Sequence, residues 1–174
     1  MSYTIFSLEE CKIKASILLK NLNSTQLEVS VVASERFRNI SFFQTMLLDD
    51  LIKSARLKHA LDVIALENGF SSWVNLKFYF MKTKTSILPA GGGFLHKWFS
   101  SYKEARANFT AINEFLFPYK KDFFIANAGY IDYIGLDITN PDWQLIGNNW
   151  VEPSNKLAWE RLNKLNLQHA KGDK

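Results

Sequence analysis

The chain has 174 residues, of which 47% are hydrophobic and 22% are charged, and its formal net charge is +4. This composition is typical of a globular protein and excludes a disordered or collagen-like chain, and the apolar runs are too short to span a bilayer. The N-terminal segment has acidic residues where a secretion signal would be basic and then apolar, and the single cysteine, Cys11, cannot form an internal disulfide. We therefore expect a cytoplasmic protein without membrane contact, with Cys11 buried as a small apolar side chain.

The first predicted element is a helix that begins at Ser7. Ser7 and Glu10 form an S-x-x-E capping box, in which each side chain accepts a hydrogen bond from the backbone of the other residue. Apolar residues then recur at spacings of three and four as far as Leu22, and they give the helix one buried face. A second helix should begin near Leu27 and run past Phe37, because the apolar spacing resumes there.

A third helix is expected at about residues 45–53, and two more lie between Leu57 and Lys77 on either side of Gly69. Alanine at 65 and glycine at 69 have the spacing of a DNA-binding helix-turn-helix. Beyond the glycine, apolar residues follow too soon, and the second helix has no arginine to pair with guanine. We therefore expect a structural hairpin, with Gly69 as a left-handed helix stop and with Phe70 and a buried Trp73 packed between the two helices. A helix-turn-helix regulator remains an alternative.

The same segment has the pattern H-A-x-x-x-I-A-x-x-x-G-F-x-S-W-x-x-L-K. Its fixed positions are His59, Ala60, Ile64, Ala65, Gly69, Phe70, Ser72, Trp73, Leu76 and Lys77. The pattern resembles a short helical module of uncharacterised bacterial proteins, which also accompanies glyoxalase-superfamily and ankyrin-type proteins. The resemblance implies a bacterial source and a helical fold for about 20 residues. It does not imply glyoxalase activity, because the chain has no suitable set of metal-binding His and Glu residues on strands.

The sequence changes character after residue 82. A proline and three consecutive glycines indicate a linker at 83–93, which divides a helical domain at 1–82 from a small α+β domain at 94–174. Aromatic residues at GFLHKWFSSY predict a strand, and a serine at 100 or 101 should cap a helix through KEARANFTAINEF. FLFPYKKDFFIAN predicts a second strand, in which Pro118 marks an edge or a bulge. The predicted fold class is α+β.

The C-terminal part should contain a loop and a closing helix. An Asn-Pro turn opens the loop, which Trp143 and Trp150 are expected to anchor. Ser154 should cap the helix, with Leu157, Leu162 and Leu165 buried and the last residues, HAKGDK, frayed. Residues Asp137, Asn140 and Asp142 lack the glycine and glutamate of a calcium loop, and an Asx-turn explains them better.

Charge is unevenly distributed along the chain. Eight Lys or Arg and two Glu from Lys77 to Lys121 give a local net charge of +6, and one Lys and six acids from Asp122 to Glu160 give −5. Basic residues among aromatic ones are typical of single-stranded nucleic-acid sites, where rings stack on bases and lysines neutralise phosphates. The candidate residues for binding nucleic acid or a partner protein are Lys97, Trp98, Tyr102, Lys103, Arg106, Tyr119, Lys120 and Lys121. The alternative is that the rings form the core and the lysines form a solvated rim facing the acidic segment.

Catalysis has weaker support in the sequence. A metal-free ribonuclease could use His96 as general base, with Lys97, Lys120 or Lys121 stabilising the phosphorane and Tyr102 or Tyr119 assisting proton transfer. The chain has no Walker loop, H-E-x-x-H, G-x-S-x-G or C-x-x-C motif. The main prediction is therefore a binding protein, not an enzyme, without cofactor or metal, and the ribonuclease is an alternative.

Overall fold

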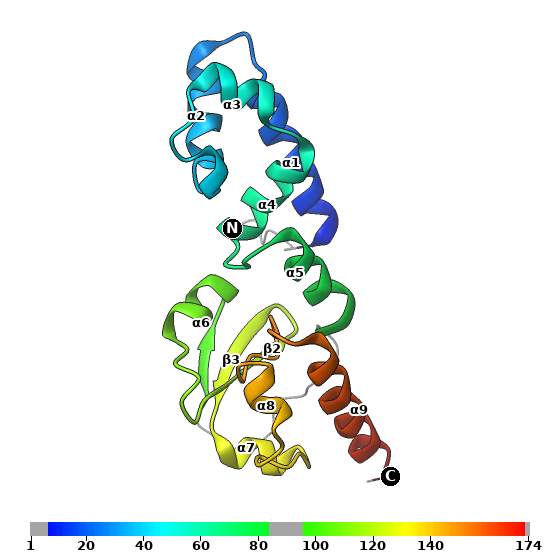
Figure 1. The fold of residues 1–174 in the computed structure, drawn as a ribbon. Coiled ribbons are helices and arrows are strands. Elements are labelled where there is room, and N and C mark those ends of the chain that lie inside the picture. The colour runs from blue at the N-terminus through cyan, green and yellow to red at the C-terminus, as the bar shows by residue number, and fades with distance from the viewer. Residues whose placement is uncertain (1–6, 84–95, 173–174) are drawn as a thin grey trace. The chain divides into compact units, whose positions relative to one another are not determined.

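The computed structural model describes residues 7–83 and 96–172 and has an α+β fold (Figure 1). The chain forms two compact units, Met1–Lys77 and Phe78–Lys174. Most of the linker predicted at 83–93 lies outside the described residues. No helix in the described part of the chain is long and apolar enough to cross a membrane.

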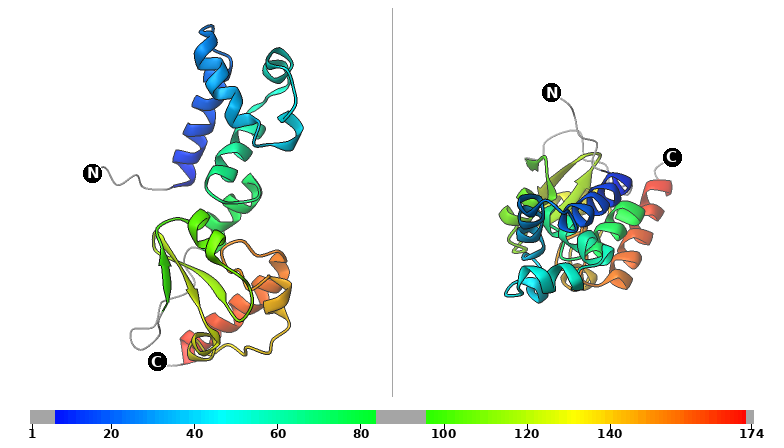
Figure 2. Two further views of the ribbon diagram at one scale, coloured as in Figure 1. Left: turned by 90° about the vertical axis from the view of Figure 1, so that its left-hand side faces the viewer. Right: turned by 90° about the horizontal axis from the view of Figure 1, so that it is seen from above.

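The first unit is helical. Its elements are α1 (Leu8–Leu22), α2 (Leu27–Phe37), the 3-10 helix η1 (Ser41–Phe43), α3 (Leu48–Ser54), α4 (Leu57–Glu67) and all but the last residue of α5 (Trp73–Phe78). Both hydrogen bonds of the predicted capping box are present: the Ser7 hydroxyl accepts from the Glu10 amide at 3.1 Å, and the Glu10 carboxylate accepts from the Ser7 amide at 3.2 Å. Helix α1 packs against α2 and α4 (Figure 2). The Cys11 thiol lies in this core, and burial raises its pKa to about 11.

The α4–α5 hairpin is closed by backbone geometry. Gly69 has φ 90°, and a Schellman motif follows α4, in which the Phe70 and Gly69 amides donate to the carbonyls of Ala65 and Leu66, each at 3.0 Å. Across the hairpin, the Trp73 amide donates to Asp62 at 2.9 Å. The predicted left-handed stop at Gly69 is confirmed.

The buried wedge of this hairpin matches the prediction at Phe70 and differs from it at Trp73. Trp73 is only half-buried, whereas Phe70 and Leu76 are completely enclosed. Trp73 is the first residue of α5, where its backbone amide is held by the Asp62 carboxylate. Helical spacing from that start directs Leu76 into the core instead.

The second unit combines a small sheet with helices. Its elements are the π-helix η2 (Tyr79–Thr83), β1 (Lys97–Phe99), α6 (Tyr102–Asn108), β2 (Phe115–Tyr119), β3 (Asp122–Ala126), α7 (Ala128–Tyr133), α8 (Asp142–Leu145) and α9 (Lys156–Gly172). The sheet is antiparallel, with the order β1-β3-β2. In Figure 1, α6 lies on one side of the sheet, and α8 and α9 lie on the other.

In this unit, one predicted strand and one predicted helix were too long. FLFPYKKDFFIAN is not one strand but the hairpin β2–β3, which turns at Lys120 and Lys121. Ser101 caps α6 as expected, accepting from the Glu104 amide at 3.3 Å, but the helix ends at Asn108. Beyond it the chain turns through positive φ at Ala111 and Asn113, which is incompatible with a continuing helix. Pro118 lies on the outer strand β2, where no neighbouring strand needs its missing donor.

An aromatic cluster fills the second unit. Trp143 and Trp150 are buried as predicted, with ring centroids 5.7 Å apart. The cluster also includes Phe115, Phe117, Phe124, Tyr130 and Trp159. These side chains join one face of the sheet to α7, α8 and α9.

Helix α9 is rotated from the orientation that the sequence predicted. Its cap is Asn155, whose side-chain oxygen accepts from the Ala158 amide at 3.1 Å, and not Ser154. Leu162 is buried as expected, but Leu157 and Leu165 are exposed. The buried face instead consists of Ala158, Trp159, Leu162 and Asn166. The helix continues through the segment that we expected to be frayed, as far as Gly172.

Candidate binding surface

The two faces of the sheet separate the predicted site residues. Successive residues of a strand point to opposite faces, and directly paired residues share a face. Trp98 pairs with Phe124, which pairs with Phe117, whereas Lys97 pairs with Ile125 on the other face. The neighbours Lys97 and Trp98 therefore cannot belong to one flat surface.

A partly exposed aromatic group lies on the face that carries Trp98. The ring centroids of Trp98 and Tyr119 are 5.9 Å apart, and those of Trp98 and Phe124 are 5.0 Å apart. Trp98 is 47% exposed, Tyr119 is half-buried and Phe124 is completely buried. The buried Phe124 ring and the half-buried Tyr119 ring thus flank Trp98, while part of the Trp98 side chain remains accessible to a ligand.

The β2–β3 turn brings positive charge to this aromatic group. Lys120 and Lys121 form the two-residue turn, and both are exposed. Lys120 has φ 51°, and its Nζ lies 5.1 Å from the centre of the Tyr119 ring. The acid Asp122 pairs directly with Tyr119 and shares its face, so it partly offsets this charge. We call Trp98, Tyr119 and Lys120 the Trp98 surface.

Tyr102 and Arg106 belong to a network on the opposite side of the sheet. Helix α6 packs there, and Tyr102 contacts Phe123 with ring centroids 5.6 Å apart. The buried Tyr102 hydroxyl donates to Glu152 at 3.0 Å and accepts from Asn149 at 2.8 Å, and Arg106 donates to Glu152 at 3.3 Å. Burial raises the pKa of the Tyr102 hydroxyl, so it stays protonated. This network ties α6 to the loop before α9.

Internal pairing also uses part of the basic segment. Lys97 forms an ion pair with Glu114 at 2.7 Å, and this pair holds the pKa of the Glu114 carboxyl below its usual value. Arg106 pairs with Glu152 in the acidic segment. Lys103 and Lys120 are exposed and form no ion pair with any described residue. The charge asymmetry of the sequence is thus partly compensated within the second unit.

His96 lies against the core. Its ring centroid is 4.9 Å from that of Phe124 and 5.0 Å from that of Tyr130, and burial lowers its pKa. These contacts are on the face opposite to Lys97. The structure therefore does not bring His96 and Lys97 to a common phosphate position, and the His96 ring packs on Phe124 and Tyr130.

The alternative DNA-reading helix, α5, has only 6 residues. Its exposed side chains include Val74 and Lys77 and no arginine. The Schellman motif at Gly69 and the hydrogen bond from the Trp73 amide to Asp62 give this segment a role in backbone closure.

The acidic residues before α8 form turns. The Thr139 amide donates to Asp137 at 2.8 Å and the Asp142 amide donates to Asn140 at 2.9 Å, as expected for Asx-turns. Asp142 is buried and accepts two hydrogen bonds from Arg161 of α9, one at 2.9 Å. No group of three or more His, Cys, Asp or Glu side chains that could hold a metal ion occurs among the described residues.

Some of these contacts had no signal in the sequence. Glu152 accepts a hydrogen bond from Arg106, which lies 46 residues earlier in the chain, and Arg161 donates to Asp142, which lies 19 residues earlier. No local spacing predicts such pairs. The separation of Lys97 from Trp98 did have a signal, because adjacent residues on any strand face opposite sides. No protein-family model, curated protein or solved structure matches the chain, so function must be inferred from this geometry alone.

Proposed function

We propose that the protein is a binding protein that takes single-stranded nucleic acid on the Trp98 surface. The observation that supports this most is the 47% exposure of Trp98 beside Tyr119, with the Lys120 ammonium above the Tyr119 ring. Base stacking on such a ring contributes about 1–3 kcal/mol and tolerates any base sequence. A location inside the cell, where single-stranded nucleic acid occurs, belongs to the same proposal.

The surroundings favour an anionic ligand at the end of the sheet where β2 turns into β3. The Lys120 ammonium lies over the Tyr119 ring at the turn, so a phosphate could contact Lys120 while a base stacks on Trp98. Lys103 and Arg106 are on α6, which covers the opposite face. The proposed site is therefore smaller than the predicted set of eight residues. It predicts that Lys120 at the turn contributes to binding and that Lys103 and Arg106 on α6 do not.

The experiment is a titration of a fluorescently labelled single-stranded oligonucleotide at low and at moderate salt. Trp98→Ala should lower the affinity about tenfold, because one stacked base is lost. Lys120→Ala should lower both the affinity and the slope of its salt dependence, because each neutralised phosphate releases condensed counterions. Lys103→Ala is the matched control, since it removes an equal charge from the other side of the sheet.

Three results would contradict the proposal. The first is the absence of binding at low salt, which would leave a protein partner as the remaining version of a binding function. The second is an equal loss for Lys103→Ala and Lys120→Ala, which would show that only net charge matters. The third is unchanged affinity for Trp98→Ala in a protein whose circular dichroism is that of the wild type.

A further inference from the structure

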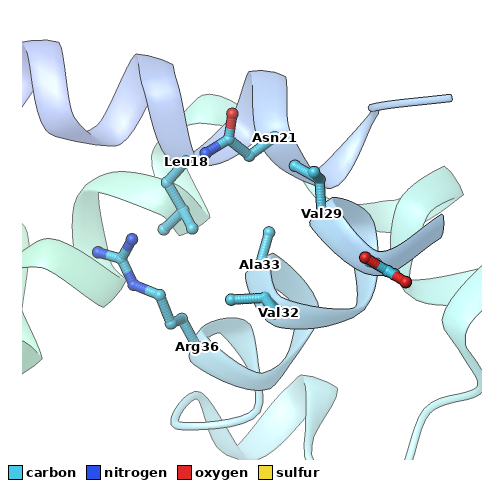
Figure 3. A pocket seen from close by; sticks show the side chains of 7 residues that line it. Leu18, Asn21, Val29, Val32, Ala33 and Arg36 are labelled. Atoms are coloured by element: carbon cyan, nitrogen blue, oxygen red, sulfur yellow. The ribbon is translucent and has the colours of Figure 1, made fainter. Parts of the chain in front are cut away.

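A second accessible surface lies in the first unit, between α1 and α2. It contains a pocket of about 290 Å³, in which apolar side chains from both helices surround the opening (Figure 3). The lining residues are Leu18, Asn21, Glu28, Val29, Val32, Ala33 and Arg36. Most of them come from α2, at positions that recur every three to four residues on one side of that helix.

The centre of this side of α2 is apolar and open to solvent. Val32 is 67% exposed although Ala33, beside it, is buried. On α1, Ile17 is 52% exposed and lies one turn from Asn21, so apolar surface continues beyond the pocket. Exposed valine and isoleucine side chains on two neighbouring helices favour a surface that a partner covers.

The charges at the ends of this side of α2 are complementary to each other. Glu28 lies four residues before Val32 and Arg36 lies four residues after it. Each charge is thus one helical turn from Val32, at a distance of about 6 Å along the axis. Glu28 has no ion-pair partner among the described residues. Two nitrogens of Arg36, Nε and Nη2, bond Glu67 at 2.7 Å each, and its Nη1 forms no hydrogen bond with a described residue.

This side of α2 can therefore pair with the same side of α2 in a second copy of the chain. If a second α2 lies antiparallel on the first with Val32 on the twofold axis, a residue four positions before the axis meets one four positions after it. Glu28 of each copy then faces Arg36 of the other, and the valines meet in the middle. A parallel arrangement would instead place Glu28 on Glu28 and Arg36 on Arg36.

We propose that two copies of this chain associate through α2 in this antiparallel register, with Val32 at the twofold axis. The interface comprises part of an 11-residue helix from each copy and the adjoining edge of α1. Because so few residues of each copy take part, we expect a reversible dimer whose population depends on protein concentration. This inference is independent of the proposed nucleic-acid surface, which is in the other unit.

The first experiment measures mass by sedimentation equilibrium of the full chain over a range of concentrations. The wild type should approach twice the monomer mass as concentration rises. Val32→Glu should weaken association by at least about tenfold, because two carboxylates meet on the axis. Leu27→Glu is the matched control: Leu27 is 69% exposed on the same helix, about 140° around it from Val32, and this variant should associate like the wild type.

The second experiment tests the register by exchanging charges. One chain carries Glu28→Arg, and another carries Arg36→Glu together with Glu67→Arg, which keeps the internal ion pair with its charges reversed. Each chain alone should associate at least about tenfold more weakly than the wild type, because like charges face each other twice. An equimolar mixture should form the heterodimer, in which both contacts are again between opposite charges.

Several results would overturn the proposal. One is a wild-type protein that stays monomeric up to about 1 mM, where even a weak association is half complete. Another is a dimer that Val32→Glu leaves intact or that Leu27→Glu abolishes to the same degree. A mixture of the two charge variants that gains no association over either alone would overturn the antiparallel register. Circular dichroism of each variant confirms that a lost dimer is not a lost fold.

Discussion

The two units of the chain build their cores in different ways. In the first, helices meet through small and aliphatic side chains such as Cys11, Ala15 and Leu18 on α1 and Ala60 on α4. In the second, seven large aromatic residues form the centre of a cluster that joins the sheet to three helices. Small residues let helices approach closely over their whole length, whereas aromatic ones allow short elements to share a core, because each ring buries a large area. The first unit also buries three phenylalanines, Phe37, Phe43 and Phe70, so the two cores differ in how far large rings dominate them.

The largest expected effect tests this dependence on large rings. Trp150 is completely buried and contacts Phe117, Trp143 and Trp159 with ring centroids 5.5–5.8 Å apart. Trp150→Ala should cost about 3–5 kcal/mol in the free energy of unfolding, enough to unfold many domains of this size. Near-ultraviolet circular dichroism should be lost while the far-ultraviolet signal of the first unit persists. Trp98→Ala, at a half-exposed ring, is the control, and equal losses for the two variants would contradict the comparison.

A smaller effect is expected at the hairpin of the first unit. Gly69→Ala places a side chain at φ 90°, in the left-handed region, and should cost about 1 kcal/mol or more in the free energy of unfolding. Urea unfolding followed by far-ultraviolet circular dichroism measures this change. Val74→Ala, at an exposed position of α5, should change the midpoint much less. A Gly69→Ala protein as stable as the wild type would contradict the prediction that the hairpin needs a glycine at this positive φ.

The smallest expected effect is a dependence on pH in the second unit. Hydrogen bonds from Arg161 hold the pKa of Asp142 below its usual value. A lowered pKa in the folded state stabilises the protein above the ordinary aspartate pKa, and this contribution is lost as pH falls through the lowered value. The urea midpoint should therefore fall less between pH 6 and pH 3 in Asp142→Asn than in the wild type. Asp132→Asn, at an exposed residue, is the control and should keep the wild-type dependence.

The same contrast explains which features the sequence could predict. The capping box at Ser7 and the left-handed stop at Gly69 are local signals, and each was found where expected. In the second unit, α7 and α8 have 6 and 4 residues, too few to show a helical period. The turn between β2 and β3 has Lys120 in a position that usually takes glycine or asparagine, so the hairpin resembled one strand.

The rotation of α9 and the contacts of the candidate site depend on long-range packing, which the sequence does not show. Asn155 and Ser154 are adjacent and both are good caps, but burial of the Trp159 ring fixes the rotation of α9 and exposes Leu157 and Leu165. For the candidate site, the sequence identified the segment that carries Trp98, Tyr119 and Lys120. It did not identify that Tyr102 and Arg106 are held by Glu152, since that contact spans 46 to 50 residues.

The backbone of Lys120 suggests a trade-off between stability and activity. At φ 51° a lysine is less stable than glycine, because its Cβ crowds the backbone in the left-handed region. Lys120→Gly should therefore stabilise the second unit, by about 0.5–1 kcal/mol after the extra chain entropy of glycine is counted. The same change removes the ammonium above the Tyr119 ring. If the Trp98 surface binds nucleic acid, the more stable variant should be the weaker binder, and the strained turn would be a cost that selection accepts for the charge it positions.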